Sequence, residues 1–352
     1  MTEHAAMIAR AARLLAPIAP SGFEYRAGDA FAEVARELGA RDVTVDAGGN
    51  HVAWFGSPDA SIRRMLTAHV DEIGFLVSRI DQSGLLRCDP VGGWDRSVVL
   101  GQRVRIAGSG PEGNDGDHPH CHGVTCRAAI HTMTQVQAAK SPSYTDLWID
   151  IGVASADEAA RFVRVGDPLV IESPMHTYPS GRLMARALDD RIGVLACLEA
   201  AARCTNDDVE CVVLGAGTEE IGGFGAMVGT YAIAPGEAIA IDVVPTTDVP
   251  DSDIGDIGLG NGPVVTFGAV VSQRIARELL ALAEEREIPV QLEAAGSTTG
   301  TDTEAVVRAG AGVATGLVSI PTRNLHMPAE ICDMGDVDQV VELVAAWLSR
   351  PV

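Results

Sequence analysis

The sequence predicts an α/β fold, in which a helix-covered, mostly parallel sheet is combined with an inserted small β-barrel domain. Segments of strand and helix period alternate before residue 70 and again after residue 180. Between them, the chain reads as short strands broken by Gly, Pro and Asp, with little helical periodicity. We therefore expect a catalytic α/β domain built from residues 1–73 and 174–352, and an inserted β domain over 74–173.

Apolar segments of strand character recur through both α/β parts. They lie at residues 43–45, 51–54, 64–68, 209–215, 238–242, 264–267 and 313–317. Helices are expected where apolar residues recur at three- and four-residue spacing, at 28–38, 190–202, 272–286 and 337–349. The first residues also form an amphipathic pattern, which ends at Pro17.

The middle of the chain contains the strand-like strings FLVSRID, GLLRCDPVGG, GQRVRIAG, LWIDIG and DPLVIES. Short strands broken by Gly, Pro and Asp are typical of a small β-barrel or sandwich. Such a small domain leaves edges that a second copy of the chain covers most readily, so we expect self-association. The alternative is an insert that only covers its own active site.

Composition excludes several classes of protein. The 352 residues include 26 Lys and Arg against 48 Asp and Glu, a net charge of −22. This field repels phosphate backbones and anionic bilayers, so we expect no nucleic-acid and no membrane partner. The sequence shows no signal peptide and no apolar stretch long enough to span a membrane. Its seven cysteines are scattered, which favours a cytoplasmic protein with reduced thiols.

Imidazoles and carboxylates stand at the ends of the apolar runs. In the string AHVDEIG, His69 and Asp71 are two residues apart, so on an extended strand their side chains point the same way. A metal-ligating imidazole usually has its second ring nitrogen held by a carboxylate, a role that suits Asp71. The alternative is a strand-end histidine beside a solvated aspartate.

Two further strings contain paired acids. Asp189 and Asp190 stand where a strand passes into a helix, either as helix N-terminal acids or with one carboxylate between two metal ions. Glu219 and Glu220 close the apolar strand 211–214 and lead into glycines. Because burying unpaired carboxylates is costly, this pair suits one metal ligand and one general base.

The set is completed by two residues farther along the chain. Asp242 ends the apolar run AIAI, at the edge where open α/β sheets place their ligands. His326 lies in RNLHMP, a loop after a strand. Either residue alone could be structural, but the strand-end placement of the whole set predicts a metal-dependent hydrolase.

The chain resembles the M42 metallo-aminopeptidases, which include glutamyl and tetrahedral aminopeptidases. The resemblance spans nearly the whole chain and rests on AHVDEIGFLV, VGGWD, GQRV, DIGVAS, ALDDRIGV, GTEEIGGFGA and RNLHMPAE. It implies two divalent ions, Zn²⁺ or Co²⁺, with Asp189 bridging both, and a water that they activate and Glu219 deprotonates. The implied metal ligands are His69, Asp189, Glu220, Asp242 and His326, and Asp71 is implied to orient His69.

The sequence also departs from the pattern of that family. Where Gly-Val-Ile-Gly and Pro-Pro-His are common, the chain reads GVTCRAAIH, and only His131 keeps its place. Just before it, HPHCH at 118–122 is dense in possible ligands but has no zinc-motif spacing, so we expect a flexible loop. The related aminoacylases and metallo-carboxypeptidases carry their extra domain after the last aspartate ligand. Here the long interval separates Asp71 from Asp189, which favours the aminopeptidases.

We therefore expect a dinuclear-metal aminopeptidase that removes N-terminal residues from peptides and assembles into dimers or a larger particle, including a dodecamer. The alternative within enzymes is a deacylase or amidase that acts on a small N-acyl or amidated compound through the same site. A non-enzymatic scaffold would have no use for clustered strand-end carboxylates.

Overall fold

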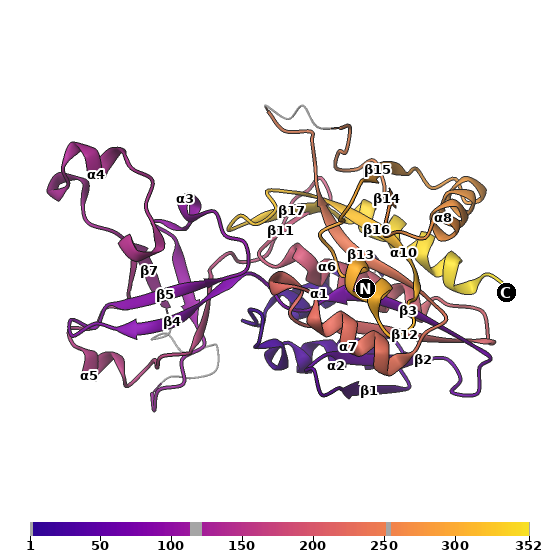
Figure 1. The fold of residues 1–352 in the computed structure, drawn as a ribbon, viewed down its shortest axis with the longest axis horizontal. Helices are drawn as coiled ribbons and strands as arrows, with labels where there is room; N and C mark the ends of the chain where they lie inside the picture. Colours follow the sequence, from indigo (N-terminus) through magenta and orange to yellow (C-terminus); the bar gives the residue numbers. More distant parts are fainter. Residues whose placement is uncertain (1–2, 113–121, 251–254, 352) are drawn as a thin grey trace.

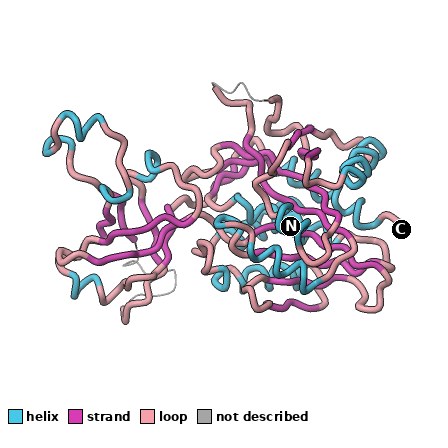
Figure 2. The backbone as a smooth tube through the Cα atoms, viewed as in Figure 1, coloured by secondary structure: helices cyan, strands magenta, loops and turns pink. Residues whose placement is uncertain are grey.

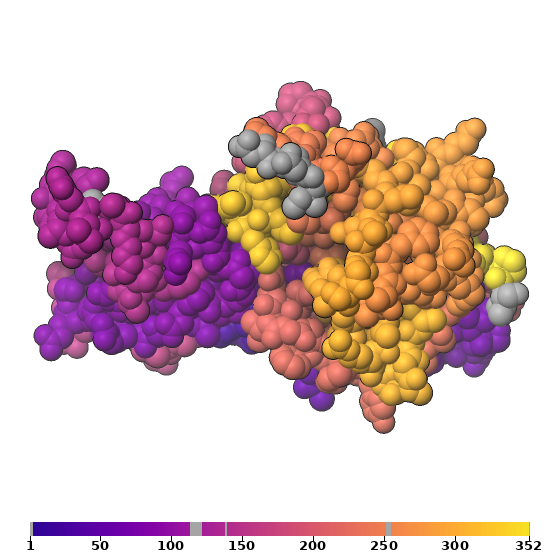
Figure 3. All heavy atoms as spheres, turned by 45° about the horizontal axis from the view of Figure 1, so that its top comes forward, coloured from indigo at the N-terminus to yellow at the C-terminus, as the bar shows by residue number. Residues whose placement is uncertain are grey.

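The computed structural model describes residues 3–112, 122–250 and 255–351. The chain forms an elongated molecule, with a larger lobe of strands and helices and a smaller lobe of strands (Figures 1 and 3). Figure 2 shows strands in both lobes and long helices in the larger lobe only.

The larger lobe is organised around one sheet of eleven strands, counted within the described residues. Its main path runs β1-β2-β12-β3-β13-β16-β17-β11-β10, and β14 joins β16 and carries β15. The central strands β12, β3, β13 and β16 are parallel, and antiparallel strands flank them. The strands are β1 (Asp42–Val45), β2 (His51–Phe55), β3 (Ile62–His69), β10 (His176–Thr177), β11 (Arg182–Ala185), β12 (Val209–Ala216), β13 (Glu237–Pro245), β14 (Val264–Gly268), β15 (Gln291–Ala295), β16 (Ala314–Arg323) and β17 (Glu330–Asp333).

Helices cover both faces of this sheet. Alternate strand residues enter different cores, as a side-chain period of two requires: Leu66 of β3 joins the core with α1, α2, α6, α8 and α10, and Met65 joins that with α7 and α9. The helices are α1 (Glu3–Leu15), α2 (Gly28–Glu37), α6 (Leu188–Ala202), α7 (Phe224–Ile233), α8 (Gln273–Glu285), α9 (Thr303–Arg308) and α10 (Met334–Ser349), with 3₁₀ turns η1 (Glu24–Arg26) and η4 (Glu219–Ile221). The predicted helix-covered, mostly parallel sheet is confirmed.

The smaller lobe is a closed six-stranded barrel in the order β4-β5-β8-β7-β6-β9. Its buried side chains, among them Phe75, Leu86 and Val104, form a core separate from that of the larger lobe. The strands are β4 (Gly74–Ile80), β5 (Leu86–Val91), β6 (Arg103–Ile106), β7 (His122–Cys126), β8 (Trp148–Asp150) and β9 (Pro168–Ile171). The short helices are α3 (Arg96–Val99), α4 (Gln135–Ala139) and α5 (Ala156–Ala159), with η2 (Ile130–Thr132) and η3 (Tyr144–Asp146). The predicted barrel is thus present, and the division at residues 73 and 174 stays a prediction.

Candidate active site

The candidate ligands gather at the carboxyl edge of the parallel strands. His69 is the last residue of β3 and pairs with Ala216 of β12, directly before the turn that carries Glu219. On the other side of β3, Ala240 of β13 pairs with Thr67, so Asp242 stands level with His69. Side chains that follow neighbouring parallel strands in this way meet at one edge of the sheet.

Asp189 lies between two imidazoles that come from distant parts of the chain. Its Oδ1 is 3.0 Å from Nε2 of His69, and its Oδ2 is 3.3 Å from Nε2 of His326. Each carboxylate oxygen of Asp189 therefore faces a different histidine. The peptide bond between Asp189 and Asp190 is cis.

Two groups of potential ligands share Asp189. One consists of His69, Asp189 and Asp242, and the other of Asp189, Glu220 and His326; within each group the ligand atoms lie within 4.8 Å of one another. These are the five residues that the sequence marked as ligands. Glu219, the expected general base, lies next to these groups. Its Oε2 is 3.9 Å from Nε2 of His69.

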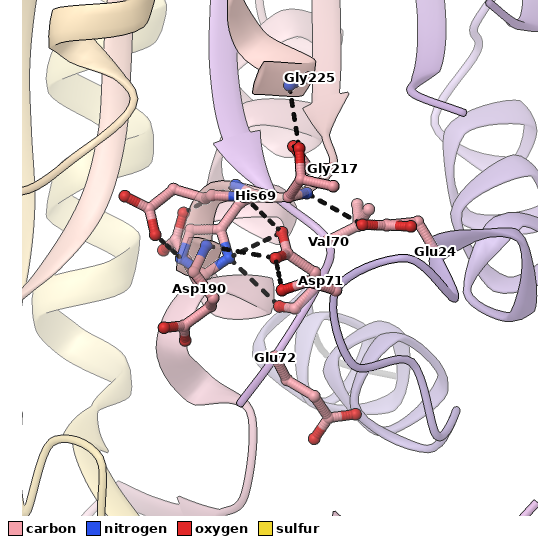
Figure 4. A network of polar contacts seen from close by, with 12 residues as sticks. Glu24, His69, Val70, Asp71, Glu72, Asp190, Gly217 and Gly225 are labelled. Carbon is pink, nitrogen blue, oxygen red and sulfur yellow. Dashed lines mark hydrogen bonds and ion pairs between the residues drawn. The ribbon is translucent and has the colours of Figure 1, made fainter. Parts of the chain in front are cut away.

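Asp71 is fully buried beneath these groups and accepts several hydrogen bonds (Figure 4). Its carboxylate accepts from the hydroxyl of Ser21 at 2.6 Å and from the backbone N–H groups of Glu219 at 3.2 Å and Glu220 at 3.3 Å. Nδ1 of His69 lies 3.2 Å from the backbone oxygen of Asp71 and 3.5 Å from its Oδ1. Asp71 thus contacts the His69 ring mainly through its carbonyl, while its carboxylate holds the turn with the two glutamates.

The clustered carboxylates carry an electrostatic cost. Burial raises the pKa of Glu219, and it raises the pKa values of Glu220 and Asp242 well above the usual range, with the neighbouring carboxylate of Asp189 adding to each effect. Oε1 of Glu220 is buried and has no hydrogen-bond partner among the described residues. Positive charge is needed here to compensate buried carboxylates.

The histidines supply only part of that charge. Burial opposes protonation of His69, but the hydrogen bonds of Asp189 and Asp71 outweigh it and raise the imidazole pKa well above its usual value. The hydrogen bond that His326 donates to the Asp189 carboxylate likewise raises the pKa of His326. The uncompensated carboxylates and the mixed imidazole–carboxylate donor set fit divalent cations.

Glu330, which the sequence did not single out, supports two of the predicted ligands. It is buried at the start of β17, and its carboxylate accepts from the backbone N–H of Asp189 at 3.1 Å and of His326 at 3.2 Å. Its position four residues after His326, in RNLHMPAE, was the available signal. Glu330 therefore connects the ends of two segments that are far apart in sequence.

A cavity of about 640 Å³ opens beside this cluster. It is lined at one end by Glu219, Glu220 and His326, and it continues between α7 and α9. A substrate that reaches the candidate ligands has room in this cavity for one of its side chains.

The HPHCH string at 118–122, where the sequence predicts a flexible loop, is described only at its last residue. Residues 118–121 of the HPHCH string lie outside the described residues, so the expected flexible loop remains a prediction. His122 is in the barrel strand β7, where its Nδ1 lies 3.7 Å from Oε2 of Glu172.

Among the described residues, no helix has the length and apolar content required to cross a membrane.

Comparison with known proteins agrees with this fold. A family profile for M42 glutamyl aminopeptidases matches residues 49–343. The lysyl aminopeptidase of Pyrococcus furiosus is 30% identical over 94% of this chain and 93% of its own length. The aminopeptidase APDkam598 of Desulfurococcus kamchatkensis has 30% sequence identity and superimposes with a TM-score of 0.89 over 100% of this chain and 96% of that one. The TET1 peptidase of Pyrococcus horikoshii, described as assembling into a tetrahedron or a large octahedral shell, has 27% identity and a TM-score of 0.82, covering 98% and 100% of the two chains.

The fold and the family define a peptidase, a hydrolase of peptide bonds, from a class that depends on metal ions. The chain belongs to the M42 family of aminopeptidases.

Proposed function

We propose that this protein is a dinuclear-metal aminopeptidase that removes N-terminal residues from peptides. The observation that carries the proposal is the shared carboxylate of Asp189, which belongs to both groups of potential ligands. His69 and Asp242 would complete one metal site, and Glu220 and His326 the other. Two bound divalent ions, Zn²⁺ or Co²⁺, would polarise the scissile carbonyl and make water more acidic.

Glu219 is the proposed general base. Its carboxylate is beside the His69 ring and lines the cavity, so it can reach both the ligand cluster and a substrate. It would accept a proton from the attacking water and deliver it to the nitrogen of the leaving amine. Asp71 would act as a positioning residue, because it fixes the backbone of the Glu219 turn and the His69 ring. The free α-amine of the peptide would dock near the remaining carboxylates.

The proposal is tested with chromogenic substrates on protein loaded separately with zinc, cobalt and manganese. We expect hydrolysis of aminoacyl substrates that have a free α-amine, loss of activity on chelation, and recovery when a metal is returned. Matched N-acetylated substrates serve as the control, because acetylation removes the positive charge of the amine and leaves the side chain and the scissile bond unchanged. Preferential hydrolysis of N-acyl compounds would instead support the deacylase or amidase.

We also propose that the protein self-associates, first as a dimer and then as a larger particle such as a dodecamer. The support is the smaller lobe, whose outer segment exposes two apolar side chains: Ile130 in η2 is 62% exposed and Val136 in α4 is 80% exposed. Figure 1 shows α4 at the end of this lobe farthest from the larger lobe. Related assembly is described for the TET1 peptidase.

A cytoplasmic location also stays a prediction.

Light scattering coupled to size exclusion tests the assembly. We expect a mass of at least a dimer at micromolar concentration and a smaller mass for Val136→Lys. Val165→Lys is the matched control, because Val165 is also an exposed valine of the smaller lobe, at 63%. A monomeric wild-type protein would contradict self-association, and a dimer that grows no further would contradict only the larger particle.

A further inference from the structure

The part of the cavity that lies between α7 and α9 has apolar side chains on both sides. Phe224 and Met227 of α7 stand on one side and Ala305 of α9 on the other. The two α7 side chains are 57% and 40% exposed, although large apolar side chains are normally buried. They are one helical turn apart and therefore lie on the same face of α7. This exposed apolar face borders the cavity that the candidate base Glu219 also lines.

Glycine keeps the part of the cavity nearest Glu219 open. Gly223 has a φ of +69°, and a Cβ atom there would lie only 3.3 Å from Cβ of Ala305. A side chain at this position would thus be strained and would narrow the space between α7 and α9. The remaining glycines of the lining are Gly93, Gly222 and Gly300.

The charged groups of the cavity do not favour a charged occupant. Glu304 and Arg308 are one turn apart on α9, and Oε1 of Glu304 already accepts from the backbone N–H of Thr299 at 2.5 Å. The side chain of Arg308 is exposed and makes no hydrogen bond or ion pair with any described residue. An acidic side chain would gain this one exposed cation, worth at most about a factor of five, and would lie near several carboxylates. A lysine side chain would meet the like charge of Arg308 beside the opposite charge of Glu304, so these two groups largely offset each other.

We propose that this cavity receives the side chain of the substrate's N-terminal residue, that this side chain is long and apolar, such as that of leucine, methionine or phenylalanine, and that Met227 sets its size. The inference rests on the aminopeptidase function proposed above and adds its substrate class. In an apolar pocket, one methylene group changes kcat/KM by roughly 10–200-fold, more than an exposed ion pair contributes.

The test uses the full-length, metal-loaded protein with p-nitroanilides of leucine, methionine, phenylalanine, alanine, glutamate and lysine. We expect kcat/KM for the leucine substrate to exceed that for the glutamate and lysine substrates at least tenfold. Met227→Trp narrows the cavity and should lower the leucine-to-alanine ratio of kcat/KM at least tenfold. Met227→Ala enlarges it and should raise the phenylalanine-to-leucine ratio at least threefold.

Val228→Trp is the matched control, because Val228 is 43% exposed on the same helix but does not line the cavity. Its leucine-to-alanine ratio should stay within twofold of the wild-type ratio. A preference for glutamate that Arg308→Ala abolishes would overturn the inference, as would unchanged ratios in both Met227 variants. Failure to hydrolyse any free-amine substrate would contradict the proposed function as well, whereas hydrolysis with a charged preference would contradict the apolar pocket alone.

Discussion

Oδ1 of Asp71 accepts a hydrogen bond from the backbone N–H of Glu219 at 3.2 Å. The two residues are joined across the edge of the sheet, because Asp71 follows β3 and Glu219 follows β12. The buried carboxylate of Asp71 also accepts from the Ser21 hydroxyl and from the backbone N–H of Glu220. The position of the proposed base therefore depends on a residue that is not among the proposed metal ligands.

Asp71→Asn tests this dependence. The variant keeps the shape of the side chain but turns one acceptor into an N–H₂ group that faces donors. We expect kcat or metal affinity to fall about 10–100-fold, as is usual when a partner of a ligand is changed. Steady-state kinetics and a competition assay with a metal chelator measure both quantities. Activity and affinity within twofold of the wild type would contradict the positioning role.

Glu330→Gln is expected to weaken metal binding, because Glu330 holds the backbone of two proposed ligands. Glutamine keeps one acceptor, so either Asp189 or His326 loses the hydrogen bond to its backbone N–H. Metal affinity should fall about tenfold or more. Glu293→Gln is the control, since Glu293 accepts from the Thr266 hydroxyl at 2.8 Å in the pair of strands β14 and β15. Equal chelator sensitivity in the two variants would contradict a role of Glu330 in metal binding.

The ligand strings could be predicted because strand ends are visible in a sequence. The apolar runs before His69, Glu219 and Asp242 indicate strands, and parallel strands bring their carboxyl ends to one edge. The support from Glu330 could not be predicted, because it acts on backbone N–H groups of residues whose proximity depends on the fold. A sequence also does not state whether the strands of the smaller lobe close, since closure depends on pairing between β4 and β9 at opposite ends of the insert.

Two helices of the larger lobe were missed for reasons that their residues explain. Helix α7 carries Gly225 and Gly229, which weaken a helical pattern, yet both are required by packing. A Cβ atom at Gly225 would lie 2.2 Å from the backbone oxygen of Gly217, and one at Gly229 would lie 2.6 Å from Leu214. Helix α9 has only six residues, too few for its period to be recognised.

Glu72→Gln is predicted to destabilise the fold rather than the chemistry. Glu72 is 3% exposed and is paired with Arg186 and with Arg191, whose Nη2 is 2.9 Å away. Removal of its charge leaves both guanidinium groups unpaired and should lower the free energy of unfolding by about 3–5 kcal/mol. Glu37→Gln is the control, because Glu37 pairs with arginines at a surface position 40% exposed and should cost less than about 1 kcal/mol.

Chemical denaturation measures the free energy of unfolding of both variants, and equal losses of stability would contradict the burial argument.

The contribution of Glu72 to stability should also depend on pH with a definite sign. Burial opposes the charge of Glu72, but Arg186 and Arg191 outweigh it and lower its pKa. Its contribution to stability is therefore present above the unfolded-state pKa, about 4.3, and is lost as pH falls through the lower folded-state value.

Asp336 should give the opposite pH dependence. Burial raises the pKa of this carboxyl to about 6, although the backbone N–H groups of Gly260 and Gly262 donate to it at 2.8 Å. Because the unfolded value is about 3.9, its contribution is full below that pH and is lost as pH rises to about 6. Relative to Asp336→Asn, the wild-type protein should lose up to about 3 kcal/mol between pH 4 and 7. Denaturation curves with parallel pH profiles would contradict the raised pKa.

In the proposed mechanism, two metal ions share Asp189 while Glu219 performs the proton transfer. The most direct test is the Glu219→Gln variant. Its metal content is measured by mass spectrometry, and its turnover of a free-amine substrate is measured on the same sample. We predict two ions per chain, as in the wild type, with kcat reduced at least about 100-fold, because the amide fits the same space but accepts no proton. Asp189→Ala should instead lose both ions. Near wild-type turnover in Glu219→Gln would contradict the role of Glu219, and a wild-type content of one ion per chain would contradict the shared site.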